Sequence, residues 1–390
     1  MRRLALAVGL CLAPLIAQAE VAITAAVLRV EREAPLPISR LDLPSGDEGF
    51  LGGRVATADN VTTGRFLKQS YQTLEATAAP DGALAALDDL IAQGAGFVVV
   101  MAQAEDLLAL ADHAKGRDVV LLNAAAPDDA LRNEACRANV LHIAPSRAML
   151  ADGLAQYLVW KQWTAWALVH GSHPGDRLKG EAFARAAKKF GARIVETREF
   201  ADTGGARRSD SGHVLVQRQI PVFMQRLPDH DVVITADESQ VFGVYIPYRA
   251  WDARPVAGDS GLEARVWHPA HESWGATQMQ RRFEKAAGRR MTDLDYNVWT
   301  ALRSVGEAVT RANTADVAAL RAYMLSPEFG VGAFKGQPLS FRPWNNQLRQ
   351  AILLADGKLV VSVSPHEEFL HQTTRLDTLG FDQPESTCRF

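Results

Sequence analysis

Short apolar runs alternate with amphipathic stretches along most of this chain, and this alternation constrains its fold more than any other feature. Val21–Val30, Phe97–Met101 and Val119–Leu122 are apolar runs of the length expected for strands that are buried on both faces. Between the first two runs, residues 83–93 place their leucines on one face of a helix. Buried strands separated by helices predict a parallel sheet built from βαβ units.

The same alternation restarts after Pro145. Ser146 is a suitable N-cap for the next helix, because its hydroxyl oxygen can accept a hydrogen bond from a free backbone N–H of the first turn. Ala165–His170, Arg193–Phe200 and Asp231–Ala236 then predict three further strands. A chain of 390 residues is longer than one compact core usually covers. The two runs therefore predict an α/β fold with two doubly wound lobes.

The pattern changes from residue 271 onward. Residues 273–287 predict a helix, and Thr292 begins a second one, with Asp295 at the third helical position of a capping box. Gln347–Leu354 and Lys358–Val363 predict two strands joined by a tight turn. We expect the chain to visit lobe one, cross to lobe two, return and cross again. The predicted boundaries are 20–145 with 270–330 for lobe one, 146–269 with 331–365 for lobe two, and 366–390 for a C-terminal tail.

The N-terminal residues have the features of an export signal. Arg2 and Arg3 precede the apolar run Leu4–Ile16, and Ala17-Gln18-Ala19 supplies the small-x-small pattern that signal peptidase reads. A membrane anchor is the alternative, but the apolar run is well short of the roughly 20 residues that a membrane-spanning helix needs. We therefore predict a signal peptide over residues 1–19, cleavage after Ala19, and a soluble mature protein in the periplasm without membrane insertion.

Export also decides how the three cysteines are interpreted. Cys11 would be removed with the signal peptide, which leaves Cys136 and Cys388 in an oxidising compartment. The compartment favours a disulfide between them, which would tie the tail to the body of the protein; two separate buried thiols are the alternative. Neither cysteine belongs to a Cys-x-x-Cys motif, so the pair is poor evidence for zinc.

Several chemistries leave no signature in the sequence. The 42 basic and 45 acidic side chains give a net charge of −3, without the basic surplus typical of nucleic-acid binding. There is no P-loop, no Rossmann glycine fingerprint and no Gly-x-Ser-x-Gly motif. His268 and His271 have the spacing of metal ligands on a helix, but Pro269 interrupts such a helix. We expect no catalytic residue, no metal site and no cofactor.

The crossover into the second lobe resembles a known family. His142–Ser146 precedes a long helix, followed by Lys161–Trp163, the strand Ala165–His170 and the turn at Ala186–Ala192. This succession resembles the leucine/isoleucine/valine-type periplasmic substrate-binding proteins of ABC transporters. Five further motifs resemble the subfamily that is encoded beside pyrroloquinoline quinone (PQQ)-dependent alcohol dehydrogenases. These motifs are Asp59–Phe66, Arg254–Gly258, Gly332–Gly336, Phe341–Trp344 and Leu376–Gly380.

The resemblance implies the type I periplasmic binding protein fold, with two lobes joined by a multi-strand hinge. It also implies a non-enzymatic receptor that closes on a small polar ligand and then docks on an ABC transporter permease. By the same resemblance the receptor would serve a PQQ-dependent alcohol oxidation system. A periplasmic accessory or sensor protein that binds a partner such as the dehydrogenase is the alternative.

Three loops at predicted strand ends would form the ligand site. Residues 123–126 hold alanines where the amino-acid-binding relatives have hydroxyls for the ligand carboxylate, and residues 172–176 lack the tyrosine that these relatives carry. Residues 237–238 keep the acid that holds a ligand ammonium in the relatives. An aromatic cleft wall and ordinary core packing are equally good interpretations of Trp267. The candidate ligand-binding residues are Asn123, Ala124, Ala125, Ser172, His173, Asp176, Asp237, Glu238 and Trp267.

Overall fold

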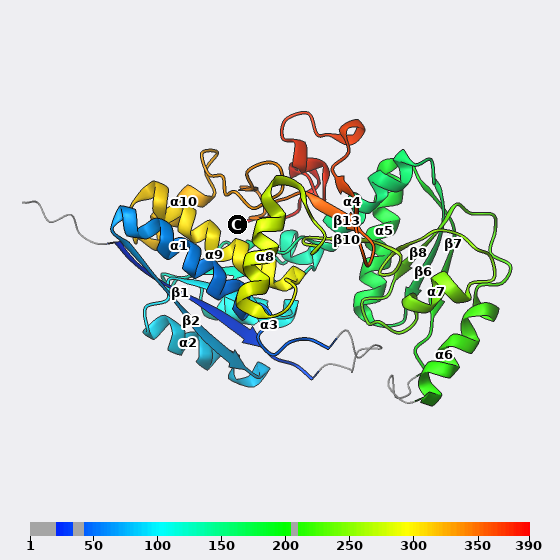
Figure 1. Cartoon of the computed structure of the whole chain (residues 1–390), viewed down its shortest axis with the longest axis horizontal. Helices are drawn as coiled ribbons and strands as arrows, with labels where there is room; N and C mark the ends of the chain where they lie inside the picture. Colours follow the sequence, from blue (N-terminus) through cyan, green and yellow to red (C-terminus); the bar gives the residue numbers. More distant parts are fainter. Residues whose placement is uncertain (1–20, 34–42, 204–209) are drawn as a thin grey trace, which may run out of the picture.

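The computed structural model describes residues 21–33, 43–203 and 210–390, and the side chains of residues 210–214 are not described. The predicted signal peptide, residues 1–19, lies outside the described residues, as does its cleavage site after Ala19. Within the described part of the chain, no helix is both long and apolar enough to cross a membrane. The chain forms two lobes, one blue to cyan with yellow helices and the other green in Figure 1.

Lobe one is built on a five-stranded sheet in which all neighbouring strands are parallel. Val27 and Leu28 are consecutive and fully buried, yet they face opposite sides of the sheet and belong to different cores. This explains why the strands Val21–Val30 and Phe97–Met101 are almost continuously apolar. In pairing order the strands are β2 (Gln69–Ala78), β1 (Val21–Val30), β3 (Phe97–Met101), β4 (Val120–Asn123) and β5 (Val140–His142).

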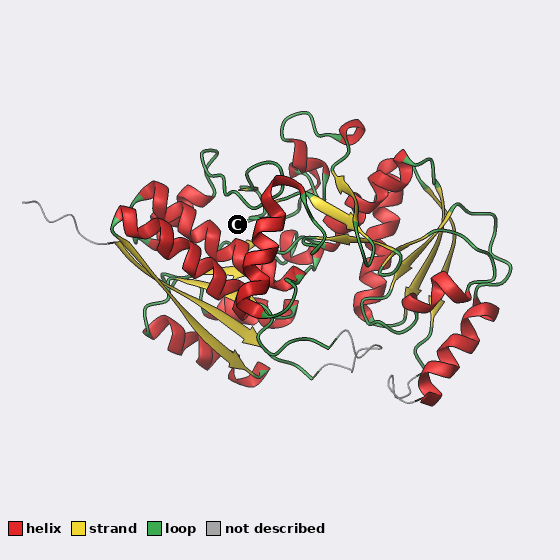
Figure 2. Cartoon of the chain, viewed as in Figure 1, coloured by secondary structure: helices red, strands yellow, loops and turns green. Residues whose placement is uncertain are grey.

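Helices cover both faces of this sheet (Figure 2). The helices of one face follow their strands directly in the sequence, whereas three helices of the other face return from residues beyond 270. One face carries α2 (Ala83–Ala92) and α3 (Ala104–His113); the other carries α1 (Phe50–Leu67), α8 (Ala276–Ala287), α9 (Asp293–Ala312) and α10 (Val317–Met324).

Lobe two has a seven-stranded sheet, parallel in its larger part and antiparallel at β13 and β14. Two cores enclose it, one under α4 (Arg147–Trp160) and α5 (Pro174–Phe190), the other under α6 (Asp210–Phe223) and α7 (Ile246–Arg249). In pairing order the strands are β14 (Val360–Ser364), β13 (Ile352–Ala355), β10 (Leu262–Arg265), β9 (Val256–Gly258), β8 (Val232–Ala236), β6 (Ala165–Gly171) and β7 (Arg193–Phe200).

The predicted helix caps are present. The Ser146 hydroxyl accepts a hydrogen bond from the backbone N–H of Met149 (3.3 Å) at the start of α4. Thr292 and Asp295 form the reciprocal capping box of α9: the Thr292 hydroxyl accepts from the Asp295 N–H, and the Asp295 carboxylate accepts from the Thr292 N–H. Local sequence therefore fixes where both helices begin.

Three segments of chain join the lobes: between β5 and α4, between β10 and α8, and between β12 (Leu348–Arg349) and β13. Side chains bind these segments to one another. Gln350 Nε2 donates to the carbonyl oxygen of Ile143 (2.7 Å), which joins the first segment to the third. Lys335 Nζ donates to the carbonyl oxygens of Val266 and Ala351, which joins the second segment to the third. The three crossings therefore form one hydrogen-bonded hinge.

Two sequence predictions differ from the structure near this hinge. The single strand expected over 347–354 divides into β12, which pairs with β11 (Ser340–Phe341), and β13, which joins lobe two. It divides there because Leu348 packs in the core of lobe one, whereas Ile352 packs in the core of lobe two. The second difference concerns the segment 331–365, predicted to belong to lobe two: in its first part, the buried side chains Val331, Leu339 and Leu348 pack in the core of lobe one. The strand β10 is not among the strands predicted from the sequence; its alternation of apolar and charged residues extends over only four residues.

The C-terminal tail connects the two lobes once more. In lobe two, the Gly380 N–H donates to the Asp152 carboxylate (2.8 Å), and Leu379 lies in the core. The tail then reaches lobe one, where Cys388 forms the predicted disulfide with Cys136. This disulfide joins positions 252 residues apart in the sequence.

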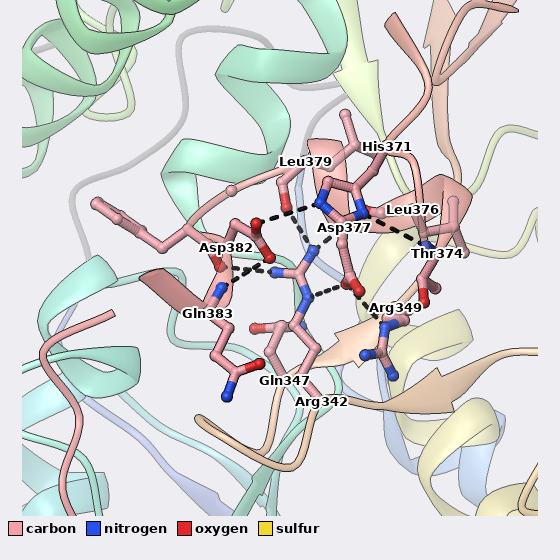
Figure 3. Close-up of polar contacts among 12 residues, drawn as sticks. Arg342, Gln347, Arg349, His371, Thr374, Leu376, Asp377, Leu379, Asp382 and Gln383 are labelled. Carbon is pink, nitrogen blue, oxygen red and sulfur yellow. Dashed lines mark hydrogen bonds and ion pairs between the residues drawn. The ribbon is translucent and has the colours of Figure 1, made fainter. Parts of the chain in front are cut away.

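Two of the resemblance motifs, Phe341–Trp344 and Leu376–Gly380, contact each other where the tail passes the hinge (Figure 3). Arg342 and Arg349 each donate through Nε to the buried Asp377 carboxylate (2.8 Å for both). Arg342 also donates to the carbonyl oxygen of Leu379 (2.7 Å). The tail is therefore held to the β11–β12 hairpin, beside the hinge, by a buried, charge-assisted network.

Candidate ligand-binding cleft

A cleft of about 990 Å³ lies between the lobes. In lobe one it is lined by residues at the carboxyl ends of β1, β3 and β4, and in lobe two by the start of α5 and the loop after β8. Its charged lining residues are Arg29, Glu31, Arg32, Glu48, Glu105, Asp128, Arg147 and Glu238, and its larger apolar residues are Met101, Pro127, Pro174, Leu178 and Leu294.

Strand order explains why the cleft lies here. In lobe one, β1 is flanked by β2 and β3, so the connections after β1 and β3 leave the sheet in opposite directions. In lobe two, β6 is flanked in the same way by β7 and β8. Such a reversal opens a crevice at the carboxyl ends of the strands, where α/β proteins bind ligands. The two crevices meet in one cleft.

Arg147 is the most enclosed charged group of the cleft, with 7% of its side chain exposed. Its Nε and one terminal nitrogen donate to the two carboxylate oxygens of Glu238 (2.9 and 2.8 Å), in lobe two. Its other terminal nitrogen lies 2.9 Å from Oδ1 of Asp128, which follows β4 of lobe one. Burial lowers the pKa of Arg147, but Glu238 and Asp128 outweigh this and raise the pKa above its ordinary value. The guanidinium therefore stays charged and bridges the lobes.

The other two arginines of the cleft also have acceptors within the chain. Arg32 donates to both carboxylate oxygens of Asp106 (2.7 Å for each) and forms an ion pair with Glu105 (2.6 Å). Arg29 donates to the carbonyl oxygens of Gly46 and Glu48. The Arg29 guanidinium lies 4.5 Å from the ring centroid of Phe50. Each arginine is therefore held in a fixed position by the protein.

The chain's own carboxylates also occupy the helix N-termini that face the cleft. Glu105 and Asp106 lie in the first turn of α3, and Asp176 lies in the first turn of α5. Glu238 adjoins α5 as well, because a Cβ placed on Gly175 would lie 2.9 Å from Glu238 Oε2. Helix N-termini attract anions, and here the anions are carboxylates of the protein itself.

Of the nine predicted ligand-binding residues, Ala125 and Glu238 line the cleft. Asn123 is fully buried, and its Oδ1 accepts hydrogen bonds from the N–H groups of Ala125 (3.2 Å) and Ala126 (2.9 Å), which shapes the turn after β4. Ala124 is also fully buried, and its carbonyl oxygen accepts from Asn297 Nδ2. The loop reaches the cleft, but these two side chains shape it from behind.

The predicted residues of the loop after β6 lie beside the cleft, and their polar groups bind within lobe two. The Ser172 hydroxyl accepts from the Asp202 N–H (3.0 Å), and exposed His173 lies 2.8 Å from the Asp202 carboxylate. The Asp176 carboxylate is fully buried and accepts from the N–H (2.9 Å) and hydroxyl (2.6 Å) of Ser239. Pro174 and Gly175, between them, are the residues that line the cleft.

Asp237 is buried and organises the loop after β8. Its carboxylate accepts hydrogen bonds from the N–H groups of Val241, Phe242 and Gly243. Burial raises the pKa of Asp237 to about 6, against the lowering effect of these three N–H groups. The adjacent Glu238 reaches the cleft while Asp237 holds its loop in place.

Trp267 packs in the core of lobe one, the second of the two interpretations considered for it. It is 2% exposed, stacks on Tyr296 with ring centroids 5.1 Å apart, and donates through Nε1 to Gln280 (2.8 Å). Trp267 lies in the second hinge segment, two residues after the end of β10, where the chain already packs in the core of lobe one.

Arg147 and Asp128 are two of the charged cleft residues that sequence reasoning missed; the others are Arg29, Glu31, Arg32, Glu48 and Glu105. Asp128 lies two residues beyond the predicted loop 123–126, and Arg147 directly follows the predicted N-cap Ser146. A charged side chain in the first turn of a helix at a lobe crossing was the available signal. Within the cleft, Asp128 and Glu238 pair with Arg147, and Glu105 pairs with Arg32. Among the residues that the structure describes, no cluster of three or more His, Cys, Asp or Glu could hold a metal ion.

Comparison with known proteins supports the fold as a whole. The sequence profile of a family described as periplasmic binding protein matches residues 70–209. None of the curated proteins matches the chain in sequence.

Three solved structures illustrate the similarity of fold. A branched chain amino acid ABC transporter periplasmic ligand-binding protein from Burkholderia xenovorans has a TM-score of 0.72 at 15% identity, over 94% of this chain and 99% of that one. The leucine-, isoleucine-, valine-, threonine- and alanine-binding protein from Brucella ovis, in a closed conformation, has a TM-score of 0.68 at 15% identity, over 91% and 98%. A solute binding protein of an ABC transporter from R. palustris, in complex with benzoate, has 0.64 at 12%, over 95% and 100%. The chain therefore has the type I periplasmic binding protein fold, and residues 70–209 carry the sequence pattern of the periplasmic binding protein family.

Proposed function

We propose that this protein is the periplasmic substrate-binding component of an ABC transporter, which captures a small polar ligand between its lobes and delivers it to a permease. The observation that carries the proposal is the cleft of about 990 Å³ at the carboxyl ends of the strands of both lobes. The hydrogen-bonded hinge of three crossings supports it, because such a hinge lets two rigid lobes close around a ligand. The protein performs no chemistry in this proposal.

A blocked cleft tests the proposal. Leu178 of α5 lines the cleft and is 44% exposed, so Leu178→Trp should fill ligand space without disturbing a core. Leu215→Trp on α6 is the matched control, since Leu215 is 54% exposed and does not line the cleft. A ligand identified by mass spectrometry of the purified protein, or by a thermal-shift screen, should bind Leu178→Trp at least tenfold more weakly in calorimetry. Equal affinity for both variants would place the ligand elsewhere.

We further propose that the receptor serves a PQQ-dependent alcohol oxidation system. The five resemblance motifs support this link. Two of them form the network of Arg342 and Asp377 that holds the tail to the β11–β12 hairpin (Figure 3). A subfamily that shares these motifs would therefore share the way its tail is attached.

The dehydrogenase itself is the partner in the alternative function. Two features of the amino-acid-binding relatives are absent from this sequence, which supports the alternative: the hydroxyls in the loop 123–126 and the tyrosine in the loop 172–176. Surface plasmon resonance between the immobilised protein and a purified PQQ-dependent alcohol dehydrogenase separates the two. Micromolar or tighter binding that survives Leu178→Trp favours the accessory role. Absence of binding, together with a small-molecule ligand, favours the receptor.

A further inference from the structure

The C-terminal tail is bound firmly to lobe two just before it leaves that lobe. Lys189 of α5 donates to the carbonyl oxygens of Thr378 and Gly380 (2.9 Å for both). Lys189 and the Gly380 N–H also donate to the same oxygen of the Asp152 carboxylate, on α4 (3.0 and 2.8 Å). The Asp152 side chain is fully buried, so these charge-assisted hydrogen bonds are shielded from water. The crossing to lobe one therefore starts from a fixed point.

The tail is bound to lobe one a few residues later, on the segment that follows β4. Cys388 forms the disulfide with Cys136. The Ser386 hydroxyl donates to the carbonyl oxygen of Arg132 (3.4 Å). The crossing therefore has a covalent attachment at its far end.

The stretch between the two attachments is short. Gly380 and Ser386 are six residues apart in the sequence, so even a fully extended chain could separate them by only about 20 Å. Part of this stretch is the helix η8 (Gln383–Glu385), which is more compact than extended chain. Only the unwinding of η8 can therefore let the two attachment points move apart.

Arg132 connects the lobe-one attachment to the loop that reaches the cleft. It is 1% exposed, and one of its terminal nitrogens donates to the carbonyl oxygens of Ala126 (2.9 Å) and Asp128 (3.0 Å). The other terminal nitrogen donates to the carbonyl oxygen of Ala144 (2.7 Å), in the first hinge segment. Ala126 and Asp128 line the cleft. A displacement of Arg132 would therefore reach both the cleft loop and the hinge.

The first turn of α4 is bound to the same loop. The Arg147 N–H donates to the carbonyl oxygen of Pro127 (2.8 Å), and the Ala148 N–H donates to the Asp129 carboxylate (3.1 Å). Asp152, which binds the tail, lies about one turn further along this helix. The tail, α4 and the segment after β4 therefore form a closed ring of contacts.

We propose that residues 380–388 form a strap that holds the start of α4 against the loop after β4 and limits how far the two lobes can part. While the disulfide is intact, the strap cannot detach from lobe one. The strap keeps Asp128 of lobe one beside Arg147 of α4 (2.9 Å). It acts on the motion of the lobes and does not depend on which ligand the cleft binds.

Distances between the lobes test the covalent end of the strap. Gln103 of lobe one and Leu178 of lobe two are exposed and line the cleft, so each is replaced by an azide-bearing residue that carries a nitroxide label. Double electron–electron resonance then gives the distribution of distances in the dialysed full chain. Cys136→Ala/Cys388→Ala should broaden this distribution and shift it to longer distances. An unchanged distribution, or a shift to shorter distances, overturns the proposal.

The hydrogen-bonded end is tested with the disulfide intact. Lys189→Met removes the two donations to the tail carbonyls and should shift the distribution in the same direction. Lys188→Met is the matched control, with the same charge change at the exposed neighbouring position, and should match the wild type. A shift in both lysine variants, or in neither, overturns the role of this end.

A pair of labels within lobe one separates release of the strap from general loosening. Labels at Arg65 and Gln103, both exposed, should give the same distances in every variant. Wild-type protein that is reduced with dithiothreitol and alkylated after labelling should reproduce the longer distances between the lobes, and this arm decides the matter if the double cysteine variant does not fold. Equal lengthening within lobe one and between the lobes would show that the lobe itself has loosened, and the strap would be rejected.

Discussion

At the scale of single residues, buried charges of the cleft and the hinge differ in the partners that satisfy them. Arg147 in the cleft has two carboxylate partners, whereas Lys335 at the hinge is 2% exposed and binds backbone carbonyl oxygens. Its ammonium also lies 5.2 Å from the ring centroid of Tyr296. Burial lowers the pKa of Lys335 to about 7, with Asp293 opposing the shift. A lysine so placed makes the hinge sensitive to pH.

The first prediction concerns this pH dependence. Between the folded pKa of about 7 and the ordinary value of 10.5, the unfolded chain binds a proton at Lys335 that the folded chain does not. The contribution of Lys335 to the free energy of unfolding should therefore rise with pH, by up to about 1.4 kcal/mol per pH unit. Urea unfolding at pH 7, 8 and 9 should show this slope as the difference between wild type and Lys335→Met. Lys358→Met, at an exposed position, should follow the wild type; a difference for Lys335→Met that is constant with pH would contradict the prediction.

At the scale of elements, close helix packing in lobe one depends on glycines. A Cβ on Gly52 of α1 would lie 2.1 Å from the backbone oxygen of Asp295, in the first turn of α9. A Cβ on Gly306 of α9 would lie 2.1 Å from the Asn60 side chain of α1. The two helices therefore approach backbone to backbone at one point and side chain to backbone at another. The Asn60 amide uses this proximity to donate to the carbonyl oxygen of Leu302 (2.9 Å).

The second prediction concerns Gly52→Ala. Alanine favours an isolated helix over glycine by about 1 kcal/mol. Here the contact with the α9 backbone should dominate and lower the free energy of unfolding by about 1–3 kcal/mol, because neither backbone can move aside alone. Gly332→Ala is the control, since a Cβ there has nothing within 4 Å. Chemical denaturation measures both, and an increase in stability for Gly52→Ala would show that helix propensity outweighs packing.

At the scale of the whole molecule, the tail adds a fourth connection to the three hinge segments. It is fixed to lobe two at Gly380 and to lobe one by the disulfide of Cys136 and Cys388. Before these points in the chain, Asp377 binds Arg342 and Arg349 of the β11–β12 hairpin (Figure 3). Opening of the lobes must therefore be accommodated by the tail as well as by the hinge.

The third prediction concerns the disulfide. Cys136→Ala/Cys388→Ala removes a covalent link across 252 residues and should lower the free energy of unfolding by on the order of 2–5 kcal/mol. Without ligand, the double variant should also show a larger radius of gyration in small-angle scattering, because one connection between the lobes is lost. Wild-type protein reduced with dithiothreitol should match the variant in melting temperature. An oxidised wild type no more stable than the variant would contradict this role.

At the candidate site, local sequence predicts where the loops lie but not which of their side chains face the cleft. Loops 123–126, 172–176 and 237–238 were expected at strand ends, and all three follow strands of the two lobes. Which side chain of each loop faces the cleft was not predictable. Asp237 and Glu238 are neighbours of like chemistry, yet one turns inward to three N–H groups and the other outward to Arg147.

The alternation of strands and helices, the caps at Ser146 and Thr292, and the two cysteines available for pairing could be predicted from the chain alone. These features depend on hydrophobic period and on groups within a few residues of one another. Three outcomes required the folded molecule: the strand over 347–354 divides at the hinge, the tail bridges the lobes, and Arg147 lies between Asp128 and Glu238. Those outcomes depend on contacts between residues far apart in the chain, whose geometry exists only once both lobes have formed.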